Sequence, residues 1–236
     1  MNERQLKILQ TLIEQFFESA TPIGSKALLE TEQFHFSGAT LRNEMAEMEE
    51  QGLLFHPHTS AGRMPTTQGY RLYVDKLLNR EDARKRVLKV IAQKQLQIKK
   101  RETRSKVWNA VNLMSETTSN LAFATLPNNK QTLFIGMANV LRQPEFMHQP
   151  EIASQVFEMV EKDFHEILEN LEITNELRIF IGEENLMPNF ASCSMLAVKY
   201  GLNDGEGILG ILGPKRMDYG FNTALLEHIQ ANLNQL

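Results

Sequence analysis

The chain has 236 residues, of which 42% are hydrophobic and 23% are charged, so it has room for two domains and is too apolar to be wholly disordered. Its formal net charge is −4, but residues 1–108 hold 18 Lys and Arg against 13 Asp and Glu, whereas residues 109–236 hold 7 against 16. Such an asymmetry between the halves of a chain indicates contact with nucleic acid or with a membrane.

Several protein classes are disfavoured by the sequence. The single cysteine, Cys193, excludes an internal disulfide. No stretch approaches the ~18 consecutive apolar residues that span a bilayer, and the first residues lack the features of a signal peptide. We therefore predict a cytoplasmic protein that has no membrane partner.

Three helices are predicted in the first fifty residues. Residues 3–19 carry apolar side chains at helical spacing, and a short helix fits residues 25–30, with Ser25 as its cap. A third helix follows the expected cap Ser37 and ends at Gly52. Helices joined by tight turns in this way are typical of a helix-turn-helix.

A strand and a loop are predicted directly after the third helix. Residues 53–56 form the strand, and residues 57–65 form a turn-rich loop without an acidic residue. Thr66 or Thr67 is expected to cap a fourth helix. A strand and a Gly-containing loop in this place are typical of a wing.

The rest of the chain predicts helices and strands in mixed order. No Gly or Pro occurs between Arg80 and Leu126, so one long helix is expected there. The elements expected beyond it are an apolar run at 132–141, an acidic helix at 151–171, strands at 177–182, 194–200 and 207–212, and a last helix from Tyr219. This order predicts an α+β fold, with an N-terminal domain at 1–78, a linker or dimerisation helix at 79–127 and a regulatory domain at 128–236.

The outer face of the third helix is a candidate for reading bases. Leu41, Met45 and Met48 fix its buried side, so Ala39 and Asn43 project outward with Thr40 and Arg42 beside them. Small residues allow close approach to DNA, and Asn and Arg can bond base edges. A solvated helix face that binds nothing is the alternative.

The loop and the charge pattern leave this hypothesis open. Thr59, Ser60 and Arg63 can bond phosphates or enter a minor groove, but the loop could equally be an ordinary hairpin tip. Residues 1–79 have a net charge of −3, which is unfavourable for a DNA-binding domain. Residues 80–106 have a net charge of +8, so they could supply the positive field or form a solvated linker helix.

Motifs of catalysis are missing from the sequence. It contains no Walker-type phosphate loop, no H-E-x-x-H and no G-x-S-x-G. His56 and His58 form an H-x-H that a wing strand explains better than a metal site, and Cys193 enters an apolar strand as core filling. We expect no enzymatic activity, no metal and no cofactor.

Motifs near both ends of the chain occur in a recognisable order. They are RQLxIL at 4–9, PIGS at 22–25, FSxATLRNEM at 36–45, HTSAGRMP at 58–65, GYRxYVD at 69–75, NVLxQPEF at 139–146 and GILGPxRMDY at 210–219. In these motifs the chain resembles the HrcA family of heat-inducible transcription repressors. The resemblance implies a winged-helix repressor of chaperone genes that binds an inverted-repeat operator in double-stranded DNA as a homodimer.

The resemblance also implies which residues contact DNA. By position, Ser37, Thr40, Arg42 and Asn43 would face the major groove, and Ser60, Gly62 and Arg63 would make the wing contact. The full set of predicted DNA-binding residues is Ser25, Lys26, Ser37, Ala39, Thr40, Arg42, Asn43, Thr59, Ser60, Gly62, Arg63, Tyr70 and Arg71. The resemblance further implies a GAF-like C-terminal domain, interrupted by an inserted dimerisation domain, and the GroEL chaperonin as a partner.

This chain departs from the family pattern in one place. Only a few residues separate the segment 121–127 from the segment 132–146, so the chain is an abbreviated member that lacks most of the insertion and the first GAF strands. The dimer interface is then expected on the helix at 81–120 and on the C-terminal sheet. Two alternatives are a winged-helix regulator whose C-terminal domain senses a small molecule, and an interaction module that has lost DNA binding.

Overall fold

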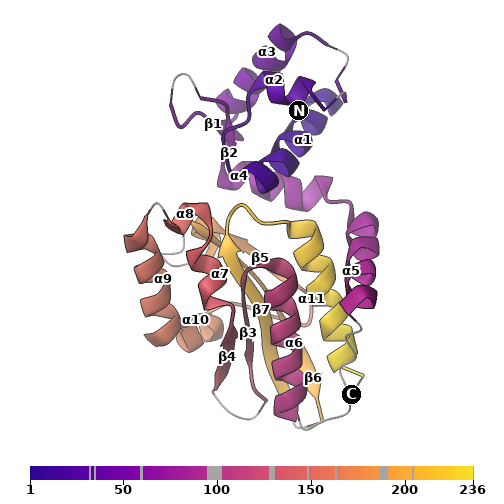
Figure 1. The fold of residues 1–236 in the computed structure, drawn as a ribbon, viewed down its shortest axis with the longest axis vertical. Helices are drawn as coiled ribbons and strands as arrows, with labels where there is room; N and C mark the ends of the chain where they lie inside the picture. The colour runs from indigo at the N-terminus through magenta and orange to yellow at the C-terminus, as the bar shows by residue number, and fades with distance from the viewer. Residues whose placement is uncertain are drawn as a thin grey trace. The chain divides into compact units, whose positions relative to one another are not determined.

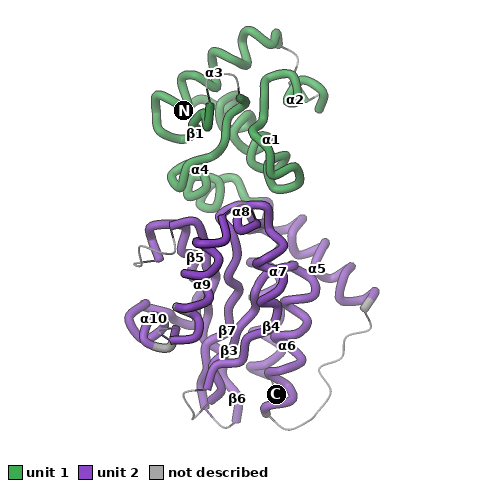
Figure 2. The backbone as a smooth tube through the Cα atoms, turned by 60° about the vertical axis from the view of Figure 1, so that its left-hand side comes forward, with its two compact units in different colours: residues 1–78 green, residues 79–236 purple. Residues whose placement is uncertain are grey.

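The computed structural model describes residues 1–31, 33–34, 36–58, 61–94, 103–127, 131–147, 149–162, 164–185, 191–203 and 205–235. The chain divides into two compact units, Met1–Leu78 (unit 1) and Asn79–Leu236 (unit 2), which Figure 2 shows in different colours. Helices accompany an antiparallel sheet, so the α+β class is confirmed. None of the helices in the described ranges is both long and apolar enough to cross a bilayer.

Unit 1 is a small helical body with a two-stranded hairpin (Figure 1). Its elements are α1 (Glu3–Ser19), α2 (Ser25–Leu29), α3 (Gly38–Glu50), β1 (Leu54–Phe55), β2 (Met64–Pro65), α4 (Thr67–Leu72) and a π-helical segment (Tyr73–Leu77). The strands pair antiparallel, Leu54 with Pro65 and Phe55 with Met64. The predicted helices and the strand of this region are therefore present.

Local capping explains where these helices begin. The Asn2 side chain accepts a hydrogen bond from the Gln5 backbone, the Ser37 side chain accepts one from the Thr40 backbone, and the Thr66 side chain accepts one from the Gly69 backbone. The expectation that Ser25 caps α2 is wrong, because Gly24 holds the cap position without a side-chain hydrogen bond and Ser25 is the first helical residue.

Unit 2 contains a five-stranded antiparallel sheet in the order β4-β3-β7-β6-β5. The strands are β3 (Leu121–Thr125), β4 (Thr132–Ile135), β5 (Arg178–Ile181), β6 (Cys193–Leu202) and β7 (Gly205–Pro214). The helices are α5 (Arg80–Lys94), α6 (Thr103–Thr118), α7 (Met137–Leu141), α8 (Pro144–Met147), α9 (Pro150–Lys162), α10 (Phe164–Asn170) and α11 (Tyr219–Leu233). The three predicted C-terminal strands and the last helix are confirmed.

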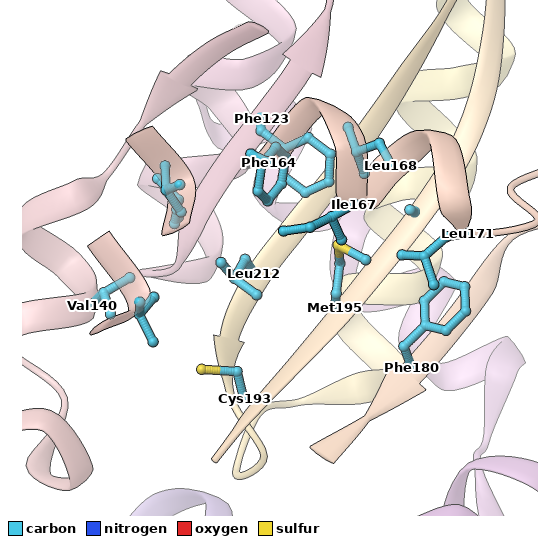
Figure 3. Close-up of a cluster of buried hydrophobic side chains, with 14 of the residues drawn as sticks. Phe123, Val140, Phe164, Ile167, Leu168, Leu171, Phe180, Cys193, Met195 and Leu212 are labelled. Atoms are coloured by element: carbon cyan, nitrogen blue, oxygen red, sulfur yellow. The ribbon is translucent and has the colours of Figure 1, made fainter. Parts of the chain in front are cut away.

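Helices cover both faces of the sheet. α6 and α11 pack on one face, with α5 against α11, while α7 to α10 supply side chains to a buried cluster on the other face (Figures 1 and 3). Phe123 belongs to this cluster, and its ring centre lies 4.7 Å from that of Phe164. Gly210 faces Phe123 across the strand pair, and a Cβ there would lie 2.2 Å from the ring, so only glycine leaves room for it.

The prediction of one long helix from residue 80 to residue 126 is wrong. α6 ends at Thr118, because Ser119 adopts a left-handed conformation with φ of 54°, and Leu121–Thr125 then enters the sheet as β3. All five residues of β3 are buried, since the strand pairs with β4 on one side and β7 on the other. Residues 79–127 are thus part of unit 2 and do not form a separate helix.

Candidate nucleic-acid interface

The outer face of α3 presents two polar side chains, Arg42 and Asn43, that make no contact with a polar group in the described residues. Leu41, Met45 and Met48 are fully buried against unit 1, as the spacing predicts, and this leaves Ala39, Arg42 and Asn43 exposed. Within the described ranges, neither Arg42 nor Asn43 has a hydrogen-bond or ion-pair partner. Both side chains are therefore available to an external ligand.

The start of α3 is fixed by a pair of hydroxyl groups. Ser37 Oγ accepts a hydrogen bond from the Thr40 backbone N–H at 3.1 Å, and it lies 3.0 Å from Thr40 Oγ1. Ser37 is exposed and Thr40 is half-buried. This cap holds the first turn, on which Ala39 and Arg42 stand, in a defined orientation.

Acidic residues of α3 are engaged by α1. Arg4 Nη1 donates to Glu44 Oε1 at 3.0 Å, and Gln5 Nε2 donates to Glu47 Oε2 at 2.9 Å. The Arg4 guanidinium also lies 5.0 Å from the centre of the Phe36 ring. Arg4 thus offsets the charge of the buried Glu44, and Gln5 holds the exposed carboxylate of Glu47 in place.

Glu49 connects the end of α3 to both sides of the hairpin. Its carboxylate lies 2.6 Å from His56 Nδ1, just after β1, and accepts a hydrogen bond from Arg63 Nε, just before β2, at 3.2 Å. Partial burial would raise the pKa of Glu49, but the hydrogen bond and charge of His56 and the charge of Arg63 together lower it below its ordinary value. We call these three residues the hairpin clamp.

Arg63 and Gly62 hold the hairpin against the connection between α1 and α2. The Arg63 backbone exchanges two 2.9 Å hydrogen bonds with Ile23, and its side chain is only 13% exposed. A Cβ on Gly62 would lie 2.4 Å from the Ile23 carbonyl carbon, so a glycine is needed there. The structure thus places both residues in contacts within unit 1. The predicted residues Thr59 and Ser60 lie outside the described residues.

The remaining predicted DNA contacts differ in their accessibility. Tyr70 is only 2% exposed, so the prediction that it contacts DNA is wrong: it lies on the inner face of α4, close to the buried Tyr73 and Val74 of the segment that follows. Arg71 is less buried and lies 3.4 Å from Asp75. Ser25 is half-buried, and Lys26 beside it at the start of α2 is exposed.

The arginines of α5 form ion pairs with acidic residues of α11 and its cap. Arg80 and Arg84 pair with Glu227 at 3.2 and 3.4 Å, and Arg86 pairs with Asp218 and lies 5.8 Å from the centre of the Phe221 ring. Three arginines of the basic segment therefore make ion pairs within unit 2. Part of the charge asymmetry between the two halves of the sequence is therefore offset by ion pairs within the fold.

Sequence reasoning missed the residues that orient this surface. Arg4 and Gln5 stand in the first motif, but their partners lie 40 and 42 positions away. Glu49 belongs to a run of acids at the end of α3, which gave no sign that it links two arms of a hairpin. A weak signal was the combination of an acidic helix end with a loop containing His56 and Arg63 but no acid.

Comparisons with known proteins place this architecture in a family. The heat-inducible transcription repressor HrcA of Ruminiclostridium cellulolyticum is 25% identical over 338 aligned residues, which cover 100% of this chain and 97% of that protein. The HrcA repressor of Shouchella clausii is also 25% identical, over 335 residues, covering 100% and 98%. Both alignments are longer than the 236 residues of this chain, so a long stretch of each relative has no counterpart here. This agrees with the prediction that the chain is an abbreviated member of the family.

A solved structure shares the fold. The crystal structure of a hypothetical protein at 2.2 Å resolution matches with a TM-score of 0.79 and 19% identity, covering 100% of this chain and 98% of that one. The sequence profile described as HrcA protein C terminal domain matches residues 73–221. Because that match spans more than half of the sequence, the chain belongs to the HrcA family.

Proposed function

We propose that this protein is a sequence-specific, DNA-binding transcription repressor of heat-shock genes that acts as a homodimer on an inverted-repeat operator. Unit 1 is the DNA-binding domain, of winged-helix type, and unit 2 is a GAF-like regulatory domain. The names of its relatives, heat-inducible transcription repressors, support this role. The observation that carries the proposal is the outer face of α3, where Arg42 and Asn43 are exposed and unpaired while nearby acids are engaged.

In this proposal the first turns of α3 enter the major groove. Ala39 is small enough to allow close approach, and Arg42 and Asn43 are side chains that form paired hydrogen bonds with guanine and adenine edges. Arg4 and Arg63 offset the charges of Glu44 and Glu49 next to phosphates, and Glu47 accepts a hydrogen bond from Gln5. The exposed Lys26 at the start of α2, together with Ser25, contacts the phosphate backbone beside the groove.

The hairpin between β1 and β2 acts as the wing. The hairpin clamp sets its position against the end of α3, so Arg63 orients the wing while residues 59 and 60 are its candidate phosphate contacts. Arg71 is a further candidate for a phosphate. A clamp of this kind lowers the entropy cost of ordering the hairpin when DNA binds.

Regulation is proposed to pass through unit 2 and to involve the GroEL chaperonin. The face of the sheet under α9 and α10 is filled by large side chains, among them Phe123 and Phe164 (Figure 3). The Phe134 ring also lies close to Phe164. This filling favours a protein signal over a small molecule held in that layer. Operator binding measured with and without chaperonin tests this part of the proposal, and equal binding would contradict it.

Selection of bound genomic fragments tests the proposed function most broadly. The purified full-length chain is mixed with sheared DNA of its source genome, and the retained fragments are sequenced. We expect enrichment of one inverted repeat upstream of chaperone genes, with retention that falls steeply as salt rises. Retention of no fragment, or of fragments without a shared repeat, would contradict sequence-specific binding.

A further inference from the structure

We propose that β4 pairs with the β4 strand of a second copy of this chain, so that two five-stranded sheets join into one sheet across a two-fold axis. The inference rests on the proposed function, because an inverted repeat requires a two-fold dimer. It adds the location and geometry of the interface.

The two edges of the sheet differ in how they are protected. β5, at one edge, begins with the charged Arg178, and the Ile181 N–H donates to the Glu184 carboxylate at 2.9 Å. β4, at the other edge, has the sequence Thr-Leu-Phe-Ile, with no charged residue and no proline (Figure 1). Charged residues, proline and satisfied backbone groups hinder edge pairing, whereas an edge strand that lacks them leaves its outward N–H and C=O groups free to pair with another strand.

The alternation of hydrogen-bonded and non-hydrogen-bonded pairs between β3 and β4 shows which backbone groups of β4 point away from β3. The Leu126 N–H donates to the Gln131 carbonyl at 2.9 Å, so this opposed pair is hydrogen-bonded. Opposed pairs alternate along an antiparallel ladder, which makes Leu133 and Ile135 the residues bonded to β3. Thr132 and Phe134 therefore direct their N–H and C=O groups away from β3, to the side on which no described strand lies.

Apolar side chains flank this edge. The Phe134 ring turns inward, 5.0 Å from Phe164, so Leu133 and Ile135 lie on the opposite face, toward α6, and both are half-buried. On α6, Ser115 Oγ accepts a hydrogen bond from Asn139 at 3.1 Å, just beyond β4. Trp108 lies two helical turns before Ser115 on the same side of α6 and is 50% exposed.

If the two-fold axis passes through Leu133, all the outward N–H and C=O groups of Thr132 and Phe134 form hydrogen bonds between the two copies. Thr132 of one copy then opposes Phe134 of the other, and the two pairs exchange four backbone hydrogen bonds. Leu133 opposes Leu133 as a non-bonded pair, for which Cα atoms lie about 4.5 Å apart. Antiparallel pairing of one strand with itself is two-fold symmetric, so the edge fits a second copy of the chain.

A symmetric disulfide tests this geometry directly. Leu133→Cys places two thiols at the axis, whereas Leu88→Cys places a thiol at a site on α5 that is 55% exposed and outside the interface. The native Cys193 does not compete, because it is 1% exposed and burial raises the pKa of its thiol to about 12. We expect rapid oxidation of Leu133→Cys to a covalent dimer, and formation no faster than for Leu88→Cys would overturn the proposal.

Non-covalent assembly supplies an independent test. Thr132→Pro removes an outward N–H, and Trp108→Lys places a charge beside the edge, with Leu88→Lys as the matched control. Sedimentation equilibrium should show a wild-type dimer, a dimer dissociation constant raised about tenfold or more by the first two variants, and little change for the control. A monomeric wild type, or a dimer insensitive to both variants, would overturn the proposal; circular dichroism checks that each variant folds.

The outcomes separate this interface from the proposed function. A dimer that depends on β4 but retains no DNA supports the pairing and contradicts the repressor. A dimer that binds the inverted repeat and is unaffected by the β4 variants contradicts the pairing and leaves the repressor intact.

Discussion

The outer faces of α3 and α5 use charge in opposite ways. α3 belongs to an acidic segment, yet it presents Arg42 and Asn43 unpaired, because Arg4, Gln5 and the hairpin engage its acids. α5 is the start of the most basic segment of the chain, yet Arg80, Arg84 and Arg86 are matched by acids of α11 and its cap. A count of charges along the sequence therefore does not show which charges the fold leaves available to a ligand, and under the proposed function that ligand is DNA.

The largest expected effect separates the two sides of α3. Leu41 is fully buried next to the exposed Arg42, so Leu41→Ala should lower the free energy of unfolding by about 2–5 kcal/mol through lost burial and a cavity. Chemical denaturation measures the loss, and Leu88→Ala, at a site on α5 that is 55% exposed, is the control. Equal losses for the two variants would show that the packed face of α3 has been misplaced.

Removal of the free cation on α3 should act on binding and leave the fold intact. Arg42→Ala is expected to weaken operator binding by about 1–3 kcal/mol, because a base-reading arginine contributes that much to discrimination. Lys76→Ala removes one positive charge from an exposed site elsewhere in unit 1. Fluorescence anisotropy on the selected operator compares them, and equal weakening would indicate a general charge effect in place of base reading.

A smaller effect is expected from the hairpin clamp, and it depends on pH. The lowered pKa of Glu49 means that the folded protein stabilises the ionised carboxylate. This stabilisation is complete at pH values above 4.5, the ordinary pKa of a glutamate side chain. It is lost as the pH falls through the lower pKa that Glu49 has in the folded protein. Glu49→Gln should therefore lower the melting temperature of unit 1 at pH 7 but not at the acid end of the titration.

The neighbouring carboxylate is a matched control for that titration. Glu50→Gln changes an exposed residue at the end of the same helix. A pH-independent difference between wild type and Glu49→Gln, or an equal response of Glu50→Gln, would show that the clamp does not depend on the Glu49 charge.

The smallest effect is expected on α5. Arg86 is 47% exposed, and exposed ion pairs contribute about 0.2–1 kcal/mol, so Arg86→Ala should reduce the stability of unit 2 slightly and leave operator affinity unchanged. Thermal unfolding and anisotropy measure the two quantities. A loss of operator affinity as large as that caused by Arg42→Ala would contradict the claim that α3 binds DNA and α5 does not.

Local signals made much of unit 1 predictable from its sequence. The spacing of Leu41, Met45 and Met48 and the caps Ser37 and Thr66 each act within a few residues, so α3 and its outer face follow from periodicity. The burial of Tyr70 also follows from the sequence, because Tyr70, Tyr73 and Val74 lie on one side of a helix. Tyr70 was predicted to contact DNA because it stands in the GYRxYVD motif, and the helical spacing argued against that contact.

Contacts between distant segments explain what the sequence did not reveal. The break after α6 depends on Ser119 and on the pairing of β3 with β7, which begins some eighty positions later, and no Gly or Pro marks the break within residues 80–126. The same holds for the pairs of Arg4 with Glu44 and of Arg86 with Asp218, which remove charges that a count along the chain treats as free.

Amide hydrogen exchange on the full-length protein, with and without the selected operator, tests the central claim most directly. We expect slower exchange on DNA binding in residues 38–43 of α3 and in the hairpin, with no change along residues 80–94 of α5. Slower exchange along α5, with α3 unchanged, would contradict it.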